Sequence, residues 1–111
     1  MTTQLKPWGT HKVVFDGDNF KVKYICVEKG KSLSLQKHFK RSESWVVLKG
    51  NPTVTKGKCK VVLKPEDTIY IPKGETHRIE AIRDNVQIIE VQHGICEETD
   101  VERISDEYGR A

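Results

Sequence analysis

The chain has 111 residues, a length that allows one domain, because two domains of this total size would each have too small a core. Hydrophobic residues make up 36% of the sequence and charged residues 32%, which is typical of a globular protein and not of a disordered or fibrous one. The net charge of +3 arises from intermixed acidic and basic residues. The sequence contains no run of five like charges, so it gives no indication of nucleic-acid binding. This weakly basic balance favours a phosphorylated small molecule as the ligand.

Cellular location is constrained by two features of the sequence. The N-terminus lacks the apolar core of a signal peptide, and no segment is long enough to span a membrane, so we expect a cytoplasmic protein. The cysteines are odd in number and show no Cys-x-x-Cys or zinc-finger spacing, so we expect reduced thiols at Cys26, Cys59 and Cys96.

The hydrophobic pattern has a period of two residues along almost the whole chain, which predicts β-strands. Clusters of Gly, Pro, Asn and Asp separate the apolar runs and predict turns between them. In chain order, the predicted strands are Lys12–Phe15, Val22–Glu28, Ser32–Gln36, Ser44–Leu48, Thr53–Lys56, Cys59–Leu63, Thr68–Ile71, His77–Ile82 and Val86–Gln92.

Many short strands at this spacing predict an all-β fold, a jelly-roll-like β-barrel in a single domain over residues 1–111. We expect an N-terminal arm at about 1–11, the barrel at about 12–93 and a C-terminal tail at about 94–111. The polar stretch from Glu97 to Tyr108 predicts one short turn of helix followed by a terminal strand.

One predicted strand and the run after it carry polar residues suited to metal binding. Gln36 and His38 are two residues apart, so their side chains leave the same face of a strand, with Leu33 and Leu35 on the other face. Glu43 opens the next apolar run after a gap that is long enough for a turn. These three side chains can therefore face one interior.

A fourth candidate ligand, His77, follows the turn at Pro72-Lys73-Gly74. Two imidazoles, one carboxylate and one amide oxygen make a mixed nitrogen and oxygen site that suits Zn, Mn, Fe, Co or Ni. Each of these residues taken alone is most often an ordinary surface or hydrogen-bonding residue, so the prediction depends on the joint pattern.

The joint pattern resembles the two motifs of the cupin family. The first runs from Gly30 to Gly50 with a ligand at position 36, then His38 and Glu43, and the second is Pro72-x-Gly74-x-x-His77. The resemblance implies a cupin jelly-roll that binds one divalent metal ion through Gln36, His38, Glu43 and His77.

A narrower resemblance covers the chain from about Lys6 to Arg110. Its most specific parts are Pro7-Trp8-Gly9, Ser34-Leu35-Gln36, Glu90-Val91-Gln92 and Tyr108-Gly109-Arg110. Together they resemble the type II phosphomannose isomerase domain, which is usually the C-terminal part of a bifunctional mannose-1-phosphate guanylyltransferase/mannose-6-phosphate isomerase. The chain has no Gly-rich nucleotide-binding loop, so guanylyl transfer is not expected of it.

The sequence departs from that family at three positions. Phe39 and Lys40 stand where histidines are common, and Ala81 stands where many cupins have Asn. None of the three is an inferred ligand, so the departures concern substrate preference more than metal binding.

By resemblance, the reaction interconverts mannose 6-phosphate and fructose 6-phosphate, which requires a base and cations that bind the phosphate. The candidates for the base are Lys40, Glu90 and a metal-bound hydroxide, and the sequence does not choose among them; an outward orientation of Glu90 is as compatible with the pattern as an inward one. The candidates for the phosphate contacts are Lys23, Arg41 and Arg110.

Two other functions stay open at the level of sequence. One is a non-catalytic metal-binding cupin that binds a sugar or another small ligand, and the other is a different cupin enzyme such as an iron-dependent dioxygenase. Gln36 in place of the usual histidine disfavours the dioxygenase. Fold analogy and the modest core predict a homodimer, and neither a nucleic acid nor a membrane is an expected partner.

Overall fold

The computed structural model describes residues 2–106 and 108–109, and this part of the chain contains eleven β-strands and no helix. The strands are β1 (Thr3–Lys6), β2 (Gly9–Asp16), β3 (Phe20–Val27), β4 (Leu35–Lys37), β5 (Arg41–Lys49), β6 (Thr53–Lys56), β7 (Cys59–Val62), β8 (Thr68–Ile71), β9 (His77–Glu80), β10 (Val86–Gly94) and β11 (Glu102–Ser105). The all-β prediction is confirmed. Within these residues there is no helix with the length and apolarity that a membrane crossing requires.

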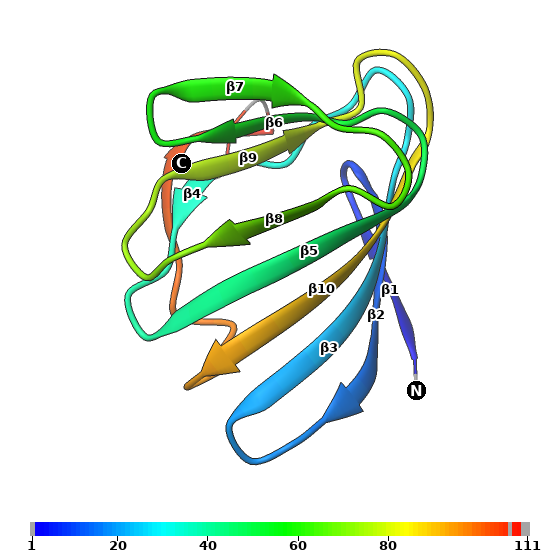
Figure 1. The fold of residues 1–111 in the computed structure, drawn as a ribbon. Helices are drawn as coiled ribbons and strands as arrows, with labels where there is room; N and C mark the ends of the chain where they lie inside the picture. The colour runs from blue at the N-terminus through cyan, green and yellow to red at the C-terminus, as the bar shows by residue number, and fades with distance from the viewer. Residues whose placement is uncertain (1, 107, 110–111) are drawn as a thin grey trace.

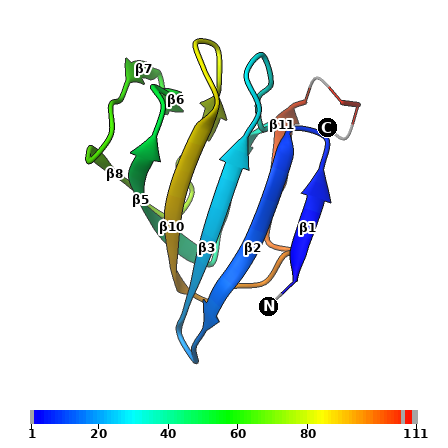
Figure 2. The same ribbon diagram turned by 90° about the vertical axis from the view of Figure 1, so that its right-hand side faces the viewer.

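The strands form two antiparallel sheets that face each other (Figure 1). The larger sheet has the order β1-β2-β3-β10-β5-β8, and the smaller has the order β11-β4-β9-β6-β7. Figure 2 shows the larger sheet from its outer side, with β2, β3 and β10 next to one another although β10 comes late in the sequence. This jelly-roll arrangement brings distant segments of the chain into one interior.

The inner face of the larger sheet is apolar at one end and charged at the other. On β10, Ile88 lies opposite Ile25 of β3 and Val47 of β5, and all three are buried in the core. One pleat further along β10, Glu90 lies opposite Lys23, and Gln92 after it lies opposite Glu43. Because successive inward residues of a strand share one face, the same strands build both the core and a polar site.

Several strand predictions agree with the structure, and one differs in a way that affects the site. The predicted strands Thr53–Lys56 and Thr68–Ile71 are β6 and β8 with the same bounds. The predicted strand Ser32–Gln36 is wrong at both ends, because β4 contains only Leu35–Lys37. Ser32 forms an isolated bridge to Glu80, so the chain before Leu35 contacts β9 without a regular ladder.

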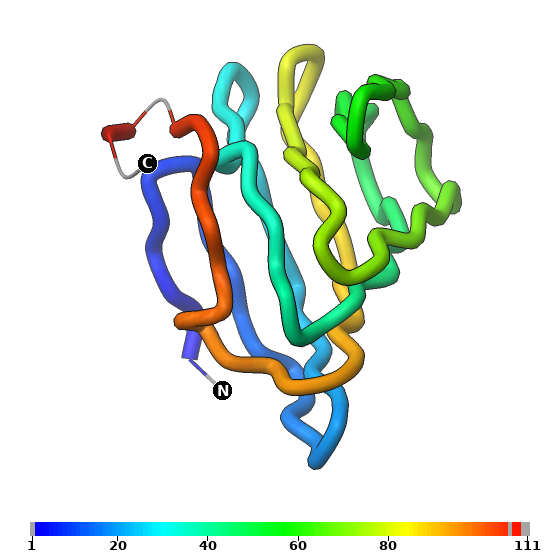
Figure 3. Tube along the Cα trace, turned by 90° about the vertical axis from the view of Figure 1, so that its left-hand side faces the viewer, coloured from blue at the N-terminus to red at the C-terminus, as the bar shows by residue number. Residues whose placement is uncertain are grey.

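Both ends of the described chain join the sheets. The expected N-terminal arm contains β1, which pairs with β2 at the edge of the larger sheet. The C-terminal segment returns beside β4, where β11 pairs with it (Figure 3). The turn of helix expected after Glu97 does not form in the described residues; the carbonyl of Glu97 instead accepts a hydrogen bond from the N–H of Asp100 in a simple turn.

Gly94 sets the direction in which the C-terminal segment leaves β10. Its φ is +114°, and a Cβ at this position would lie 2.5 Å from the carbonyl oxygen of Lys40. A side chain would therefore collide with the backbone of the β4–β5 turn. The absence of one lets residues 95–105 cross close to that turn.

Candidate metal centre

Three potential metal ligands converge from different strands. His38 follows β4, Glu43 is the third residue of β5, and His77 begins β9. One ligand atom of each residue lies within 4.8 Å of the others, and all three side chains are buried. The spacing argument therefore identified a real cluster, with the two sheets contributing to it together.

Backbone carbonyls fix the orientation of both imidazole rings. Nδ1 of His38 lies 2.6 Å from the carbonyl oxygen of Asp100, and Nδ1 of His77 lies 2.9 Å from that of Glu75. A carbonyl oxygen only accepts hydrogen bonds, so each Nδ1 carries the proton and each Nε2 carries a lone pair. Metal-binding histidines usually donate such a hydrogen bond from the ring nitrogen that does not bind the metal.

The two Nε2 atoms face the Glu43 carboxylate. His38 Nε2 lies 3.3 Å from Oε2, and His77 Nε2 lies 3.8 Å from Oε1. His77 Nε2 is buried without a hydrogen-bond partner. Burial, with the charge of Arg41, lowers the pKa of His38 to about 4, and burial also lowers the pKa of His77. Neither ring therefore carries a second proton, on Nε2, at neutral pH. Lone pairs that converge in this way fit a divalent cation.

Both oxygens of Glu43 are also held by donors. The Trp45 indole N–H donates to Oε1 at 3.0 Å, and Arg41 Nε donates to Oε2 at 3.0 Å. Arg41 Nη2 lies 3.2 Å from His38 Nε2, and Nη1 donates to the carbonyl oxygen of Glu97 at 3.1 Å. The guanidinium thus lies against two of the three candidate ligands.

Gln36 lies next to this cluster. It is the register partner of His77 across β4 and β9, and its side chain lines the adjacent pocket. Its Oε1 accepts a hydrogen bond from Ser34 Oγ at 3.3 Å. The assignment of Gln36 as a ligand stays a prediction.

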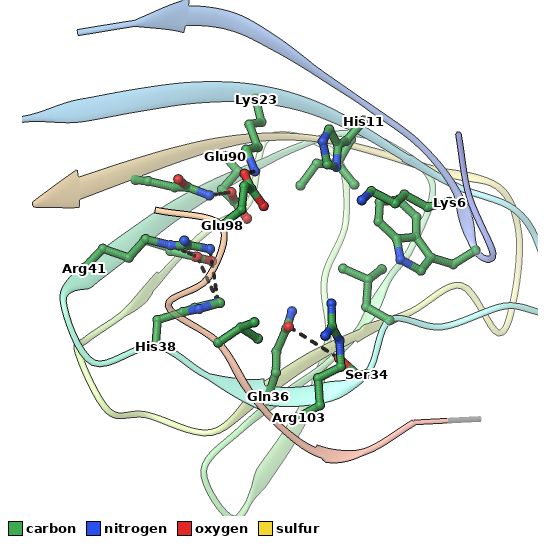
Figure 4. A pocket seen from close by; sticks show the side chains of 16 residues that line it. Lys6, His11, Lys23, Ser34, Gln36, His38, Arg41, Glu90, Glu98 and Arg103 are labelled. Carbon is green, nitrogen blue, oxygen red and sulfur yellow. Dashed lines mark hydrogen bonds and ion pairs between the residues drawn. The ribbon is translucent and has the colours of Figure 1, made fainter. Parts of the chain in front are cut away.

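The cluster borders a pocket between the two sheets. His38 and Arg41 lie on one side of the pocket and Lys6 lies across from them (Figure 4). His11, Lys23, Glu90 and Glu98 also face the space. The full lining is Lys6, Trp8, His11, Lys23, Ile25, Leu33, Ser34, Gln36, His38, Arg41, Glu43, Glu90, Gln92, Glu98, Val101 and Arg103.

Glu90 is the carboxylate at the inner wall of the pocket. The strand pattern left its direction open, and the structure directs it inward with 7% of its surface exposed. Gln92 Nε2 donates to its Oε1 at 2.6 Å. Burial, with the nearby charge of Glu43, raises the pKa of Glu90 to about 7. A carboxyl group with that pKa in a pocket is suited to accept and return a proton near neutral pH.

The sequence comparison decides the family. A profile described as mannose-6-phosphate isomerase C-terminal matches residues 1–106. The chain belongs to this family. Its relatives include a mannose-1-phosphate guanylyltransferase of Escherichia coli, 41% identical over 107 residues that make up 95% of this chain and 22% of the relative. The alginate biosynthesis protein AlgA of Pseudomonas aeruginosa is 40% identical, with 95% and 22% covered.

Members of this mannose-6-phosphate isomerase C-terminal family thus occur inside much longer proteins, because the chain spans about a fifth of the length of these curated relatives. Structural similarity agrees on the fold. KdgF from Halomonas superposes with a TM-score of 0.81 at 17% identity, covering 89% of this chain and 93% of that one. A cupin-2 domain from Rhodospirillum rubrum superposes with a TM-score of 0.70 at 22% identity, covering 82% and 67%. The cupin jelly-roll prediction is confirmed.

Of the remaining predicted site residues, one lies in the pocket, one lies outside it and one falls outside the described residues. Lys23 is buried in the pocket and forms an ion pair with Glu98. Lys40 follows the end of β4, is 53% exposed and lies 3.6 Å from the Glu97 carboxylate, so the strand alternation does not carry it into the pocket. Arg110 lies outside the described residues.

Four ionisable residues of the pocket lining were not predicted as site residues from the sequence. They are Lys6, His11, Glu98 and Arg103. Lys6 ends β1 directly before Pro7-Trp8-Gly9, and Arg103 lies on β11 opposite Gln36. No local pattern marks these residues, because they reach the pocket only when the two ends of the chain fold back over it.

The C-terminal segment forms one wall of the pocket and is held by Asp100. This carboxylate accepts hydrogen bonds from the N–H groups of Phe39 at 2.9 Å and Lys40 at 2.8 Å. Although burial opposes it, these two donors hold the pKa of Asp100 below its usual value.

Asp100→Ala should loosen this wall. It removes two charge-assisted hydrogen bonds, so we expect a loss of about 2 kcal/mol in the free energy of unfolding, measured in urea. Amide hydrogen exchange should accelerate at Phe39 and Lys40. The control is Asp18→Ala, at an exposed position in the turn between β2 and β3. Unchanged exchange at Phe39 and Lys40 would contradict this role of Asp100.

Proposed function

We propose that the chain is a metal-dependent sugar-phosphate isomerase that interconverts mannose 6-phosphate and fructose 6-phosphate. One observation carries the proposal: the lone pairs of His38, Glu43 and His77 converge beside a pocket that is also lined by the inward carboxylate of Glu90 and by several lysine and arginine side chains. Membership of the mannose-6-phosphate isomerase C-terminal family supports the substrate class.

The reaction moves one hydrogen from carbon 2 to carbon 1 and one from the O2 hydroxyl to O1. A divalent cation held by His38, Glu43 and His77, with Gln36 as the fourth proposed ligand, supplies Lewis acidity toward the charge that develops on these oxygens. Zn, Mn, Co, Fe and Ni all suit this donor set.

The pocket side chains move the carbon-bound proton and bind the phosphate, while the O2 hydroxyl releases its proton to water and O1 takes one up from water. Glu90 takes the proton from carbon 2 and returns it to carbon 1, while the Gln92 amide holds one oxygen of its carboxylate in place. Positive charge for the phosphate comes from the cationic side chains of the pocket lining, which are Lys6, Lys23, Arg41 and Arg103. Of the three candidates for the base, this arrangement favours Glu90, because Lys40 lies outside the pocket lining.

Metal removal tests the proposal directly. In an assay that couples fructose 6-phosphate formation from mannose 6-phosphate to a dye or NADPH readout, the purified chain should turn over substrate. Dialysis against a chelator should abolish turnover, and Mn²⁺, Co²⁺ or Zn²⁺ should restore it. Turnover that survives with no metal detectable by elemental analysis would overturn the mechanism.

A non-catalytic sugar-binding protein is the second candidate. It is favoured by the Lys23–Glu98 ion pair, because this contact already neutralises Lys23, one of the two buried cationic side chains in the pocket lining. Metal-loaded protein that binds mannose 6-phosphate in calorimetry but gives no turnover would support this function. A homodimer and a cytoplasmic location remain part of the proposal as predictions.

A further inference from the structure

Arg41 is a buried cation that lies directly against the proposed metal ligands. Only 6% of its surface is exposed, and its three nitrogen atoms each contact a different acceptor. Two of these acceptors, Glu43 Oε2 and His38 Nε2, are also atoms that a cation would use. The third is the carbonyl oxygen of Glu97 on the C-terminal segment.

The direction of the hydrogen bond to His38 is fixed. Nδ1 of His38 donates to Asp100, so Nε2 has no proton and accepts from Arg41 Nη2. The lone pair that would bind a metal is therefore already used. A guanidinium has hydrogen-bond donors and no acceptor, and its positive charge also repels a cation next to His38. A cation that binds here has to compete with Arg41 for His38 Nε2.

Each of the three ligands has an orienting contact that does not involve Arg41. The Asp100 carbonyl holds the His38 ring, the Glu75 carbonyl holds the His77 ring, and the Trp45 indole holds Oε1 of Glu43. We expect these contacts to remain when the Arg41 side chain is removed. Arg41 is thus a competitor of the cation more than a support of its ligands.

We propose that Arg41 couples metal binding to the binding of an anionic ligand in the pocket. The inference rests on the metal site of the proposed function. A cation that takes His38 Nε2 leaves Arg41 buried with one donor unpaired, and a buried charge in that state requires a new acceptor. Arg41 lines the pocket, so the negatively charged group of a phosphate ester supplies that acceptor. The metal and the anion then each raise the affinity for the other by the same factor.

The affinity for Co²⁺, measured by calorimetry, tests the competition. Arg41→Met removes the charge while keeping an unbranched apolar stem, and we expect it to bind Co²⁺ at least about tenfold more tightly than the natural chain. Arg41→Lys keeps the charge, so its affinity should stay near that of the natural chain. Affinity for Co²⁺ that is unchanged or weaker in Arg41→Met would overturn the proposal.

Lys21→Met is the matched control. Lys21 also donates to a carbonyl of the C-terminal segment, that of Cys96 at 3.2 Å, and it does not line the pocket. Its substitution loosens the same segment without changing the charge next to the ligands, so Co²⁺ affinity should not change. A tightening in Lys21→Met equal to that in Arg41→Met would attribute the effect to the segment and overturn the role of Arg41.

The coupling is measured with mannitol 1-phosphate, a sugar-alcohol phosphate that has no carbonyl group and cannot be isomerised. Saturation with this probe should tighten Co²⁺ binding of the natural chain by a factor in the range of about 5 to 150. The factor should fall to near one in Arg41→Met. A factor that persists in Arg41→Met would mean that the probe contacts the metal directly, and would overturn the coupling through Arg41.

These outcomes separate the inference from the function on which it rests. A natural chain that binds no Co²⁺ would overturn both. A natural chain that binds Co²⁺ and isomerises mannose 6-phosphate, with no tightening in Arg41→Met, would overturn the inference alone. Far-UV circular dichroism and urea unfolding of each variant confirm that the comparison is made between folded proteins.

Discussion

Glu43→Gln should abolish isomerase turnover and lower the affinity for a divalent cation at least about 100-fold, which exceeds the effect of losing a residue that only orients a ligand. Glu43 is the one carboxylate in the cluster, and its oxygens face the Nε2 atoms of both His38 and His77. The amide has nearly the same shape, so the loss reports on charge. Metal content by elemental analysis and turnover in the coupled assay give the two readouts.

Stability has to be measured in the same variant. Arg41 loses its buried anionic partner, which we expect to cost about 3 kcal/mol in the free energy of unfolding. Glu28→Gln, at an exposed ion pair with Lys31, is the matched control and should change neither metal content nor turnover. If folded Glu43→Gln protein retains full metal, Glu43 is not a ligand.

Glu90→Gln should separate catalysis from metal binding. Glu90 lies in the pocket but outside the cluster of three ligand atoms, so the cation should still bind. Without a base at this position, kcat should fall by about 100- to 10,000-fold. The measurement is kcat in the metal-loaded variant, together with loss of deuterium from carbon 2 of labelled mannose 6-phosphate.

The control for that variant is Glu102→Gln, on β11 at an exposed ion pair with Lys37. It should keep both kcat and metal. A Glu90→Gln variant that retains normal kcat would return the role of base to Lys40 or to the metal site itself, and these two are then distinguished by Lys40→Met.

The sequence predicts the central strands well because their alternation is set by burial. In β5, Glu43, Trp45 and Val47 are all buried, and this alternation is visible in the residue types. The two strands at the ends of the chain lack such a burial signal. β1 and β11 have mostly exposed residues, so pairing with β2 and β4 determines them, not a local hydrophobic pattern.

Within the site, spacing was sufficient for the cluster but not for its surroundings. His38, Glu43 and His77 follow from motif spacing, since His38 comes directly after β4, Glu43 is the third residue of β5 and His77 begins β9. The direction of Glu90 was not predictable, because both faces of β10 carry apolar residues: Ile88 on the face of Glu90, and Ile89 with Val91 on the other. The contact of Arg41 with Glu43 and His38 was not predictable from the sequence, which indicated only that Arg41 could bind a phosphate.

The two tryptophans of the chain lie in different surroundings, Trp45 beside the proposed metal ligands and Trp8 in the lining of the pocket. Trp45 donates to Glu43 and its ring lies 5.5 Å from that of His77, whereas Trp8 lines the pocket beside His11, with 6.4 Å between ring centroids. Each indole is therefore an intrinsic optical reporter of its own surroundings. In Trp8→Phe the emission spectrum monitors the cation, and in Trp45→Phe it monitors the other end of the bound sugar, so the order of binding becomes visible in stopped-flow fluorescence without any added dye.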